Sequence, residues 1–384
     1  MPIRCGYYRR YYPFFPGAFM RNFSTRFFPF RRRFACESMG SLVATFGLAG
    51  CMTVPPSSSY PGLYSTTTGL QNISPEMNRR SSALRDYEVL TYQPDPTCKD
   101  TSQVVKDIWS TLKSVPHAAP IGMPGCLLLT RDGLGIDESE VPNIEWKRYQ
   151  LRLAALGRSI AATQPATASL PVPDYFTNTF YDFYPVVGLS YEQVMAFCQW
   201  RGQAIEAALN RNKPVLSDSK SPAYVAVECR LPTEAEWEKA ALAGRGLPYG
   251  SRCSEAPIRV NPKAAAYLKV RSGSPESVDK IEADIKAYNQ RKPVRPFIVC
   301  NQPEPYFLRQ ATPAYVFQTP SNDYQVFHLL GNVSEMMQER GITRGGNFRD
   351  PLSACTVAAR GTYNGPAPTI GFRCVLRATL PNQR

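Results

Sequence analysis

CRLPTEAEWEKAA, residues Cys229 to Ala241, is the stretch that decides the fold of this chain. Thr233 and Glu236 have the spacing of a helix capping box, in which each side chain bonds to the backbone N–H of the other residue. The predicted helix carries three glutamates, Glu234, Glu236 and Glu238. Capping and a solvated helix face account for all three, so none of them is expected to do chemistry.

A second segment, YPVVGLSYEQVMAFCQWRG, runs from Tyr184 to Gly202. Ser190 and Gln193 repeat the capping-box pattern within it. Four apolar side chains then follow at helical spacing and predict a buried helix face: Val194, Phe197, Cys198 and Ile205.

An earlier strand and helix are predicted within IDESEVPNIEWKRYQ, residues Ile136 to Gln150. Asn143 is the expected N-cap of that helix, because its side chain can accept a hydrogen bond from the first turn. Trp146, Tyr149 and Leu153 recur at helical spacing. This spacing indicates core residues rather than a ligand site.

The third segment lies near the C-terminus, between Gly331 and Arg377, and contains GNVSE, TRGGNF, AAR and GFRCVLR in that order. In their order and spacing, the three segments resemble those of the formylglycine-generating enzymes, also called sulfatase-modifying factors. The resemblance implies an α+β domain with much irregular structure, related to C-type lectin-like folds.

A more specific resemblance is to the gliding-motility and type IX secretion lipoproteins of the Bacteroidota, which carry a degenerate copy of this domain. They share a lipid-modified cysteine, a motif similar to IDESEVPN and a longer connection before RLPTEAEWE. The domain is expected over residues 119–384, with insertions near 203–228 and 259–310. In the second insertion, Ser274-Pro275-Glu276 predicts a helix start, and that helix is the first candidate for a protein contact surface.

Residues 1–50 are typical of a signal segment that ends in a lipobox, Leu48-Ala49-Gly50 before Cys51. Cys51 is the expected lipidation site, because its thiol accepts the diacylglyceryl group. Residues 51–118 begin with a Ser-, Thr- and Pro-rich stretch that cannot bury enough apolar area to fold alone, so a tether and a poorly defined N-terminal region are expected. The expected location is the outer membrane, reached by the lipid anchor and facing the periplasm or the cell surface.

The formal net charge of +13 on 384 residues is concentrated at the N-terminus. Residues 1–50 hold eight arginines and one glutamate, which together account for +7. The remainder has no basic stripe interleaved with aromatic residues, so a nucleic-acid partner is not expected.

The cysteine content, eleven in all, suits an exported protein, because an oxidising compartment permits disulfides. Eight of them follow Cys51, and the sequence leaves their pairing open: Cys98, Cys126, Cys198, Cys229, Cys253, Cys300, Cys355 and Cys374. Neither a CxxC pair nor a cluster with zinc spacing is present, so a structural zinc site is not expected.

The resemblance also identifies positions where the family's chemistry is missing. Active members hold monovalent copper with two cysteines five positions apart, and the matching positions here are Leu352 and Val357, which cannot bind a metal. Cys355 is a single thiol between them. Iron-dependent relatives need a cluster of histidines, but this chain has only His117 and His328. Copper, iron and catalysis are therefore not expected.

Two structural sites are implied by the same resemblance. Cys198 and Cys374 match cysteines that form a disulfide in the family. A calcium site is implied around GNVSE, with the carbonyl oxygens of Gly331 and Val333 and the carboxylate of Glu335 as ligands.

The sequence and the resemblance together predict a non-catalytic, lipid-anchored scaffold protein of the outer membrane. Its expected partners are proteins of a gliding-motility or type IX secretion apparatus. Two alternatives remain open: a formylglycine-generating oxidase that acts on sulfatase cysteines, and a cell-surface module that binds glycans or peptides. The oxidase needs copper-binding thiols, whereas the binding module needs only the irregular loops of the fold.

Overall fold

The computed structural model describes residues 65–71, 122–130, 132–211, 224–242, 253–255, 257–292, 294–296, 298–302, 304–319, 321–322 and 324–379. The expected signal segment and the lipidation site Cys51 lie outside these residues. Within the described part of the chain, no helix is both long and apolar enough to cross a membrane.

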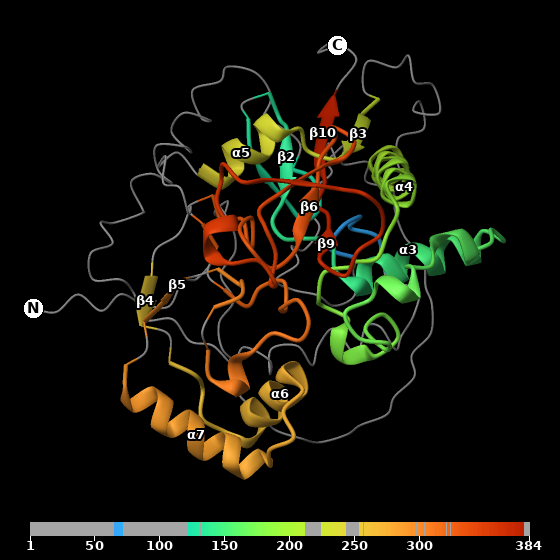
Figure 1. The fold of residues 1–384 in the computed structure, drawn as a ribbon. Helices are drawn as coiled ribbons and strands as arrows, with labels where there is room; N and C mark the ends of the chain where they lie inside the picture. Colours follow the sequence, from blue (N-terminus) through green and yellow to red (C-terminus); the bar gives the residue numbers. More distant parts are fainter. Residues whose placement is uncertain are drawn as a thin grey trace, which may run out of the picture. The chain divides into compact units, whose positions relative to one another are not determined.

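Among the described residues, the strands form two four-stranded sheets and one strand pair. Figure 1 shows their arrangement. The first sheet is antiparallel, with the order β1-β2-β10-β3: Cys126–Leu128, Gly135–Asp137, Val375–Thr379 and Ala226–Arg230. The second has the order β8-β7-β6-β9, with only β6 and β9 parallel: Arg360–Thr362, Ile342–Arg344, Ser334–Met336 and Ile370–Gly371. The pair joins β4 to β5: Cys253–Glu255 and Val294–Pro296.

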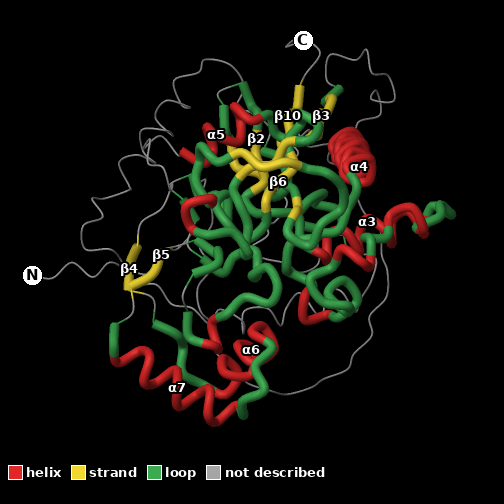
Figure 2. Tube along the Cα trace, viewed as in Figure 1, coloured by secondary structure: helices red, strands yellow, loops and turns green. Residues whose placement is uncertain are grey.

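Helices and long loops make up most of the remaining described chain (Figure 2). The α-helices are α3 to α7: Asn143–Ala155, Tyr191–Asn210, Glu234–Leu242, Pro262–Ser272 and Val278–Gln290. Short 3-10 helices, η2 to η6, lie between them: Ala161–Thr163, Thr167–Ser169, Thr179–Tyr181, Tyr306–Leu308 and Leu352–Ala354. This mixture of helices, short strands and irregular segments confirms the predicted α+β class.

Both predicted capping boxes are present. At the start of α4, the Ser190 hydroxyl accepts from the Gln193 N–H at 3.1 Å, and the Gln193 side chain accepts from the Ser190 N–H at 2.7 Å. At the start of α5, the Glu236 carboxylate accepts from the Thr233 N–H at 2.8 Å, and the Thr233 hydroxyl accepts in return at 3.3 Å. These bonds satisfy N–H groups that have no partner within the helix.

The expected N-cap of α3 is wrong. Pro142 occupies the cap position, and Asn143 is the first residue of the helix. The Asn143 side chain instead donates to the Tyr181 carbonyl at 2.8 Å, and its backbone N–H donates to the Tyr184 carbonyl at 2.9 Å. Partners from a distant loop therefore replace the local cap.

The predicted core face of α3 is confirmed. Trp146 is fully buried, and its ring stacks on Phe197 of α4 with 5.3 Å between centroids. Tyr149 and Phe372 meet the same indole edge-on, at 5.4 and 6.1 Å. This aromatic cluster joins α3, α4 and the loop before β10.

The two predicted insertions contain more regular structure than expected. α4 continues to Asn210, so residues 203–210 extend the helix, and β3 begins at Ala226. The second insertion forms α6 and α7, which lie beside each other (Figure 1).

The predicted start of α7 is also wrong. The helix begins at Val278, and the Ser277 hydroxyl caps it by accepting from the Lys280 N–H at 3.2 Å. Ile281 and Ile285 are fully buried. The apolar face of α7 therefore packs inside the domain, and its charged face remains exposed.

Residues 65–71 lie within the expected tether and poorly defined N-terminal region over residues 51–118, and they contact the domain. The hydroxyls of Ser65, Thr66 and Thr67 all donate to the Glu145 carboxylate, at 2.5, 3.1 and 2.7 Å. Burial would raise the pKa of Glu145, but the charge of Arg148 and these hydroxyl donors outweigh it and lower the pKa. A Ser- and Thr-rich segment is therefore docked on the domain by a buried carboxylate on α3.

Candidate functional site

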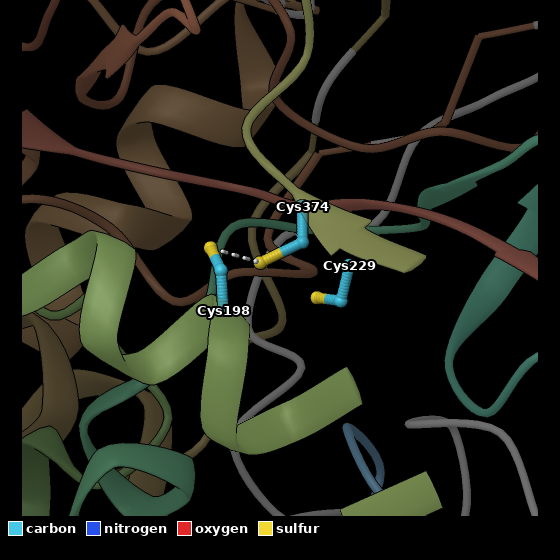
Figure 3. A group of neighbouring side chains, drawn as sticks. All are labelled: Cys198, Cys229 and Cys374. Carbon is cyan, nitrogen blue, oxygen red and sulfur yellow. Dashed lines mark hydrogen bonds between the residues drawn. The ribbon is translucent and has the colours of Figure 1, made fainter. Parts of the chain in front are cut away.

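Three thiols gather where α4 packs on β3 and the chain enters β10 (Figure 3). Cys198 comes from α4, Cys229 from β3, and Cys374 immediately precedes β10. All three sulfurs lie within 4.8 Å of one another, and those of Cys198 and Cys374 are 3.5 Å apart and not bonded. The structure thus brings the expected disulfide pair together and adds Cys229, which the sequence did not distinguish from the other cysteines.

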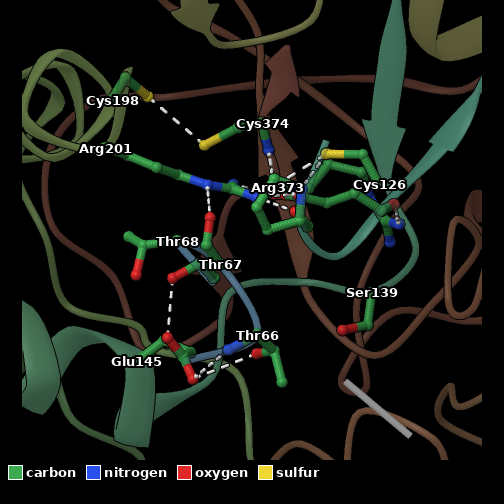
Figure 4. A network of polar contacts seen from close by, with 12 residues as sticks. Thr66, Thr67, Thr68, Cys126, Ser139, Glu145, Cys198, Arg201, Arg373 and Cys374 are labelled. Carbon is green, nitrogen blue, oxygen red and sulfur yellow. Dashed lines mark hydrogen bonds and ion pairs between the residues drawn. The ribbon is translucent and has the colours of Figure 1, made fainter. Parts of the chain in front are cut away.

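Arg201 lies beside these thiols, one turn after Cys198 on α4 (Figure 4). Its fully buried guanidinium donates two hydrogen bonds to the Asp137 carboxylate at 2.7 Å, and its Nε donates to the Thr67 carbonyl at 2.6 Å. The Cys374 N–H donates to the same carboxylate at 2.8 Å. One ion pair therefore fixes α4, β2, the docked segment and the loop before β10 around the sulfur atoms.

The three thiols differ in acidity. Burial alone would raise the pKa of Cys374, but hydrogen bonds from Cys198 and Cys229 and the charge of Arg201 lower it well below its usual value. Burial and its hydrogen bonds to the other two sulfurs raise the pKa of Cys229 well above the usual value. Cys374 is therefore the most acidic thiol of the cluster.

The disulfide implied by the family resemblance stays a prediction. We expect Cys198–Cys374 to be the principal disulfide of the oxidised protein, and its reduction to lower the free energy of unfolding by about 3–5 kcal/mol because it closes a long loop. Non-reducing peptide mapping and urea unfolding measure the two effects. Recovery of Cys374 as a free thiol in most molecules would contradict the pairing.

Glu335, the expected calcium carboxylate, is the anion of a fully buried ion pair. Arg373 donates to its two oxygens at 2.6 and 2.7 Å, and the Trp237 indole N–H donates at 2.9 Å. Gly331 and Val333, the expected carbonyl donors, lie in the loop that leads into β6. Calcium binding by these residues stays a prediction, and an ion at this position would have to displace Arg373 from Glu335.

Two further buried groups near this ion pair have strongly shifted pKa values. Burial raises the pKa of Glu140 to about 8, so at neutral pH it is a carboxylic acid, with Oε1 accepting from the Asn332 amide at 2.9 Å. Burial and the charge of Arg373 lower the pKa of His328 to about 3, so its imidazole is neutral.

These two groups predict a stability plateau between about pH 4.5 and 6.5. His328 has a folded pKa below its ordinary 6.5, so the unfolded chain takes up the extra proton and stability falls as pH drops through this range. Glu140 has a folded pKa above its ordinary 4.5, so stability falls as pH rises from 4.5 to 8. The slopes cancel where they overlap, leaving losses of about 2 kcal/mol below and above the plateau. Urea unfolding as a function of pH measures the profile.

Substitutions separate the loss of stability at low pH from the loss at high pH. Glu140→Gln removes the loss above pH 6.5, and His328→Asn removes its contribution to the loss below pH 4.5. Asparagine suits position 328 because the residue has a φ of 49°, which asparagine tolerates better than most residues. Unchanged pH profiles in both variants would contradict the assignment.

The positions that lack the family's copper ligands lie on either side of a buried thiol. Cys355, between Leu352 and Val357, is fully buried, and its thiol contacts that of Cys300. Cys300 also lines a cavity of about 270 Å³. Polar side chains form much of the cavity wall: Gln302, Glu304, Arg309, Gln310, Gln318 and Arg349. A second thiol pair, which the sequence did not indicate, thus lies beside a polar cavity.

Comparison with known proteins agrees with this architecture. The family model described as sulfatase-modifying factor enzyme 1-like domain matches residues 129–378. The inactive C-alpha-formylglycine-generating enzyme 2 of Bos taurus is 25% identical over 216 residues, and that of Mus musculus is 25% identical over 217 residues. Each match covers 52% of this chain and 52% or 51% of the relative, so the chain spans about half the length of these curated relatives.

Solved structures resemble the chain less closely. PvdO from Pseudomonas aeruginosa has a TM-score of 0.39 and 17% identity, covering 64% of this chain and 80% of that one. Treponema denticola variable protein 1 has a TM-score of 0.33 and 18% identity, covering 64% and 84%. The family match extends from Leu129 to Ala378 and includes α3, α4 and α5. It also includes both four-stranded sheets, except for β1 and the last residue of β10. This chain therefore belongs to the sulfatase-modifying factor enzyme 1-like family.

Proposed function

We propose that this chain is a non-catalytic, lipid-anchored scaffold protein of the outer membrane that takes part in a gliding-motility or type IX secretion apparatus. The non-catalytic part of the proposal rests on one observation. The charged residues in the segments that most resemble the family form ion pairs within the fold. Glu236 pairs with Arg230 through two bonds of 2.7 Å, and Glu335 is enclosed with Arg373. Glu234 is shared by two arginines of the second sheet.

The relatives support the same conclusion. The curated proteins from Bos taurus and Mus musculus are both named as inactive formylglycine-generating enzymes. Leu352 and Val357 offer no metal ligand at the positions that the family resemblance assigns to copper. A domain with this composition keeps the shape of the family without its expected chemistry.

The scaffold part rests on the lipobox before Cys51 and on the second insertion. α7 exposes a charged face while its Ile281 and Ile285 are buried, which suits contact with a polar protein surface. The Lys286 side chain on α7 is 61% exposed and forms an ion pair within its own helix, with Glu282 at 3.2 Å. It is a suitable position at which to probe a contact.

Crosslinking followed by affinity purification from the native membrane tests the proposal. We expect the wild-type protein to retain components of the secretion or gliding apparatus, and Cys51→Ser to lose both membrane attachment and those partners. Lys286→Glu should weaken partner recovery without releasing the protein from the membrane, whereas Arg340→Glu, an exposed charge change outside this insertion, should not. Recovery of no apparatus component with wild type would overturn the scaffold role.

A glycan- or peptide-binding module is the second candidate, favoured by the polar cavity beside Cys300. Gln310 lines it, and its buried Oε1 has no hydrogen-bond partner among the described residues, so a polar ligand group would be accepted there. Glycan and peptide arrays with wild type and Gln310→Ala would support this candidate if one ligand class bound only the wild type.

The oxidase alternative has a direct assay. The reduced protein, supplied with monovalent copper and oxygen, would have to convert the cysteine of a sulfatase-derived peptide to formylglycine, detected by mass spectrometry. We expect no conversion. Turnover that is lost in Cys355→Ser would replace the scaffold proposal with an enzyme.

A further inference from the structure

The sulfur atoms of Cys198, Cys229 and Cys374 are placed so that two different disulfides are within reach. A disulfide needs sulfurs about 2 Å apart, and side-chain rotation shortens separations of 3.5 to 4.8 Å without moving the backbone far. Figure 3 shows the three side chains directed toward one another from α4, β3 and the start of β10.

Strand register explains why Cys229 belongs to this group. Leu376 of β10 pairs with Cys229 of β3, and Cys374 precedes Leu376 by two residues. Residues two apart on an extended chain point to the same side, so Cys374 and Cys229 are diagonal neighbours. Gly202 permits α4 to lie close against them, because a Cβ there would be 3.3 Å from the Cβ of Cys229.

The three cysteines differ in their exposure to solvent. Cys198 and Cys374 are fully buried, whereas Cys229 is half-buried. A disulfide between Cys198 and Cys374 is therefore shielded from water-soluble thiols. Cys229 is the one partly exposed residue of the three, so a disulfide that includes it is the more accessible of the two.

The same geometry decides which sulfur leaves during exchange. Arg201 approaches Cys374 from α4 and is itself held by Asp137, so negative charge on the Cys374 sulfur is favoured. A thiolate that is stabilised in this way departs more readily from a disulfide. Arg201 also acts on Cys198, but the pKa of that thiol is raised overall, so Cys198 is better suited to remain bonded.

We infer that these three residues form a thiol–disulfide exchange site, in which Cys198 bonds in turn to Cys374 and to Cys229. Cys229 loses its proton to water and its sulfur attacks the Cys198 sulfur of the Cys198–Cys374 disulfide. The Cys198–Cys229 bond forms, the Cys198–Cys374 bond breaks, and Cys374 leaves with the electron pair as a thiolate. The step is isoelectronic and needs no oxidant.

The substrate class that this site suits is a small dithiol or its disulfide. A dithiol attacks the half-buried Cys229 sulfur, its second thiol then closes to an external disulfide, and two electrons pass to the protein as the thiols of Cys198 and Cys229. The reverse reaction with an external disulfide reoxidises the cluster. The proposal concerns a redox property of the domain, so its failure leaves the scaffold role unaffected.

Substitution of Cys374 tests whether the second disulfide exists. Cys374→Ser, oxidised with the disulfide form of dithiothreitol and mapped without reduction, is expected to yield a Cys198–Cys229 crosslink. Wild type quenched with an alkylating agent during partial reduction should give the same crosslink, with Cys374 labelled. Quantitative alkylation of Cys198 and Cys229 in the substituted protein, with no crosslink in wild type, would overturn the inference.

Reduction kinetics provide a test that does not depend on the folding of that variant. Cys229→Ser keeps the buried disulfide but removes the route to it, so reduction by dithiothreitol under native conditions should slow by about tenfold or more. Cys300→Ala, in a different hydrophobic cluster, is the matched control and should be reduced at the wild-type rate. Equal rates for wild type and Cys229→Ser, with equal urea midpoints, would mean that Cys229 takes no part.

Discussion

Arg373→Met is expected to lower the free energy of unfolding by about 3–5 kcal/mol, because it leaves the buried Glu335 carboxylate without its cation. Both side chains are fully buried, and Arg373 also donates to the carbonyls of Asp137 and Phe327 at 3.0 and 2.7 Å. Methionine fills a similar volume, so most of the loss comes from the unpaired polar groups and not from a cavity. Urea unfolding of the full chain, followed by tryptophan fluorescence, measures it.

Arg340→Met is the matched control for this prediction. Arg340 pairs with Glu192, but the two side chains are 70% and 63% exposed, so solvent screens the pair and Arg340→Met should leave the free energy of unfolding nearly unchanged. A second comparison replaces both buried partners, as Arg373→Met with Glu335→Leu, and should recover part of the loss. Equal losses in the Arg340 and Arg373 variants would show that burial does not set the strength of these pairs.

Local patterns in the sequence predicted local structure well. The capping boxes at Ser190 and Thr233 and the buried faces of α3 and α4 depend on residues three or four positions apart, which the sequence displays directly. Asn143 shows the limit of this reasoning, because the loop around Tyr181 and Tyr184 supplies the partners that a cap would have supplied.

Long-range partnerships were not predictable from composition. Residues 65–71 have the Ser- and Thr-rich character of a tether, yet Glu145 lies about 80 positions away and turns their hydroxyls into donors to one carboxylate. Nothing near residue 65 in the sequence indicates that this acceptor is buried and needs several donors.

The candidate site was also predictable only in part from the sequence. The family resemblance pairs Cys198 with Cys374, and the structure places their sulfur atoms 3.5 Å apart without a bond. Cys229 joins them only through the pairing of β3 with β10, which no sequence pattern displays. The family resemblance implied a calcium ligand at Glu335, and that stays a prediction. The burial of Glu335 with Arg373 depends on the parallel pairing of β6 with β9, which the sequence does not display.

Trp146→Ala is expected to lower the free energy of unfolding by about 3–5 kcal/mol, because the indole joins α3 to α4 and to the loop before β10. The ring is fully buried between Phe197, Tyr149 and Phe372, and its N–H donates to the Thr163 carbonyl at 2.8 Å. Alanine would leave a cavity that this rigid aromatic cluster cannot close, and it would leave the Thr163 carbonyl without that donor.

The control for this substitution lies at the end of the same helix. Leu156 caps α3 and is 67% exposed, so Leu156→Ala should change the free energy of unfolding by no more than about 0.5 kcal/mol. Trp146→Phe retains a stacking partner for Phe197 but loses the hydrogen bond, and should fall between the two. Because α4 carries Cys198 and Arg201, the Trp146→Ala variant should also make the three thiols more reactive toward alkylation before global unfolding. Thiol labelling that remains at the wild-type rate while stability falls would show that the aromatic cluster supports the fold without positioning the sulfur atoms.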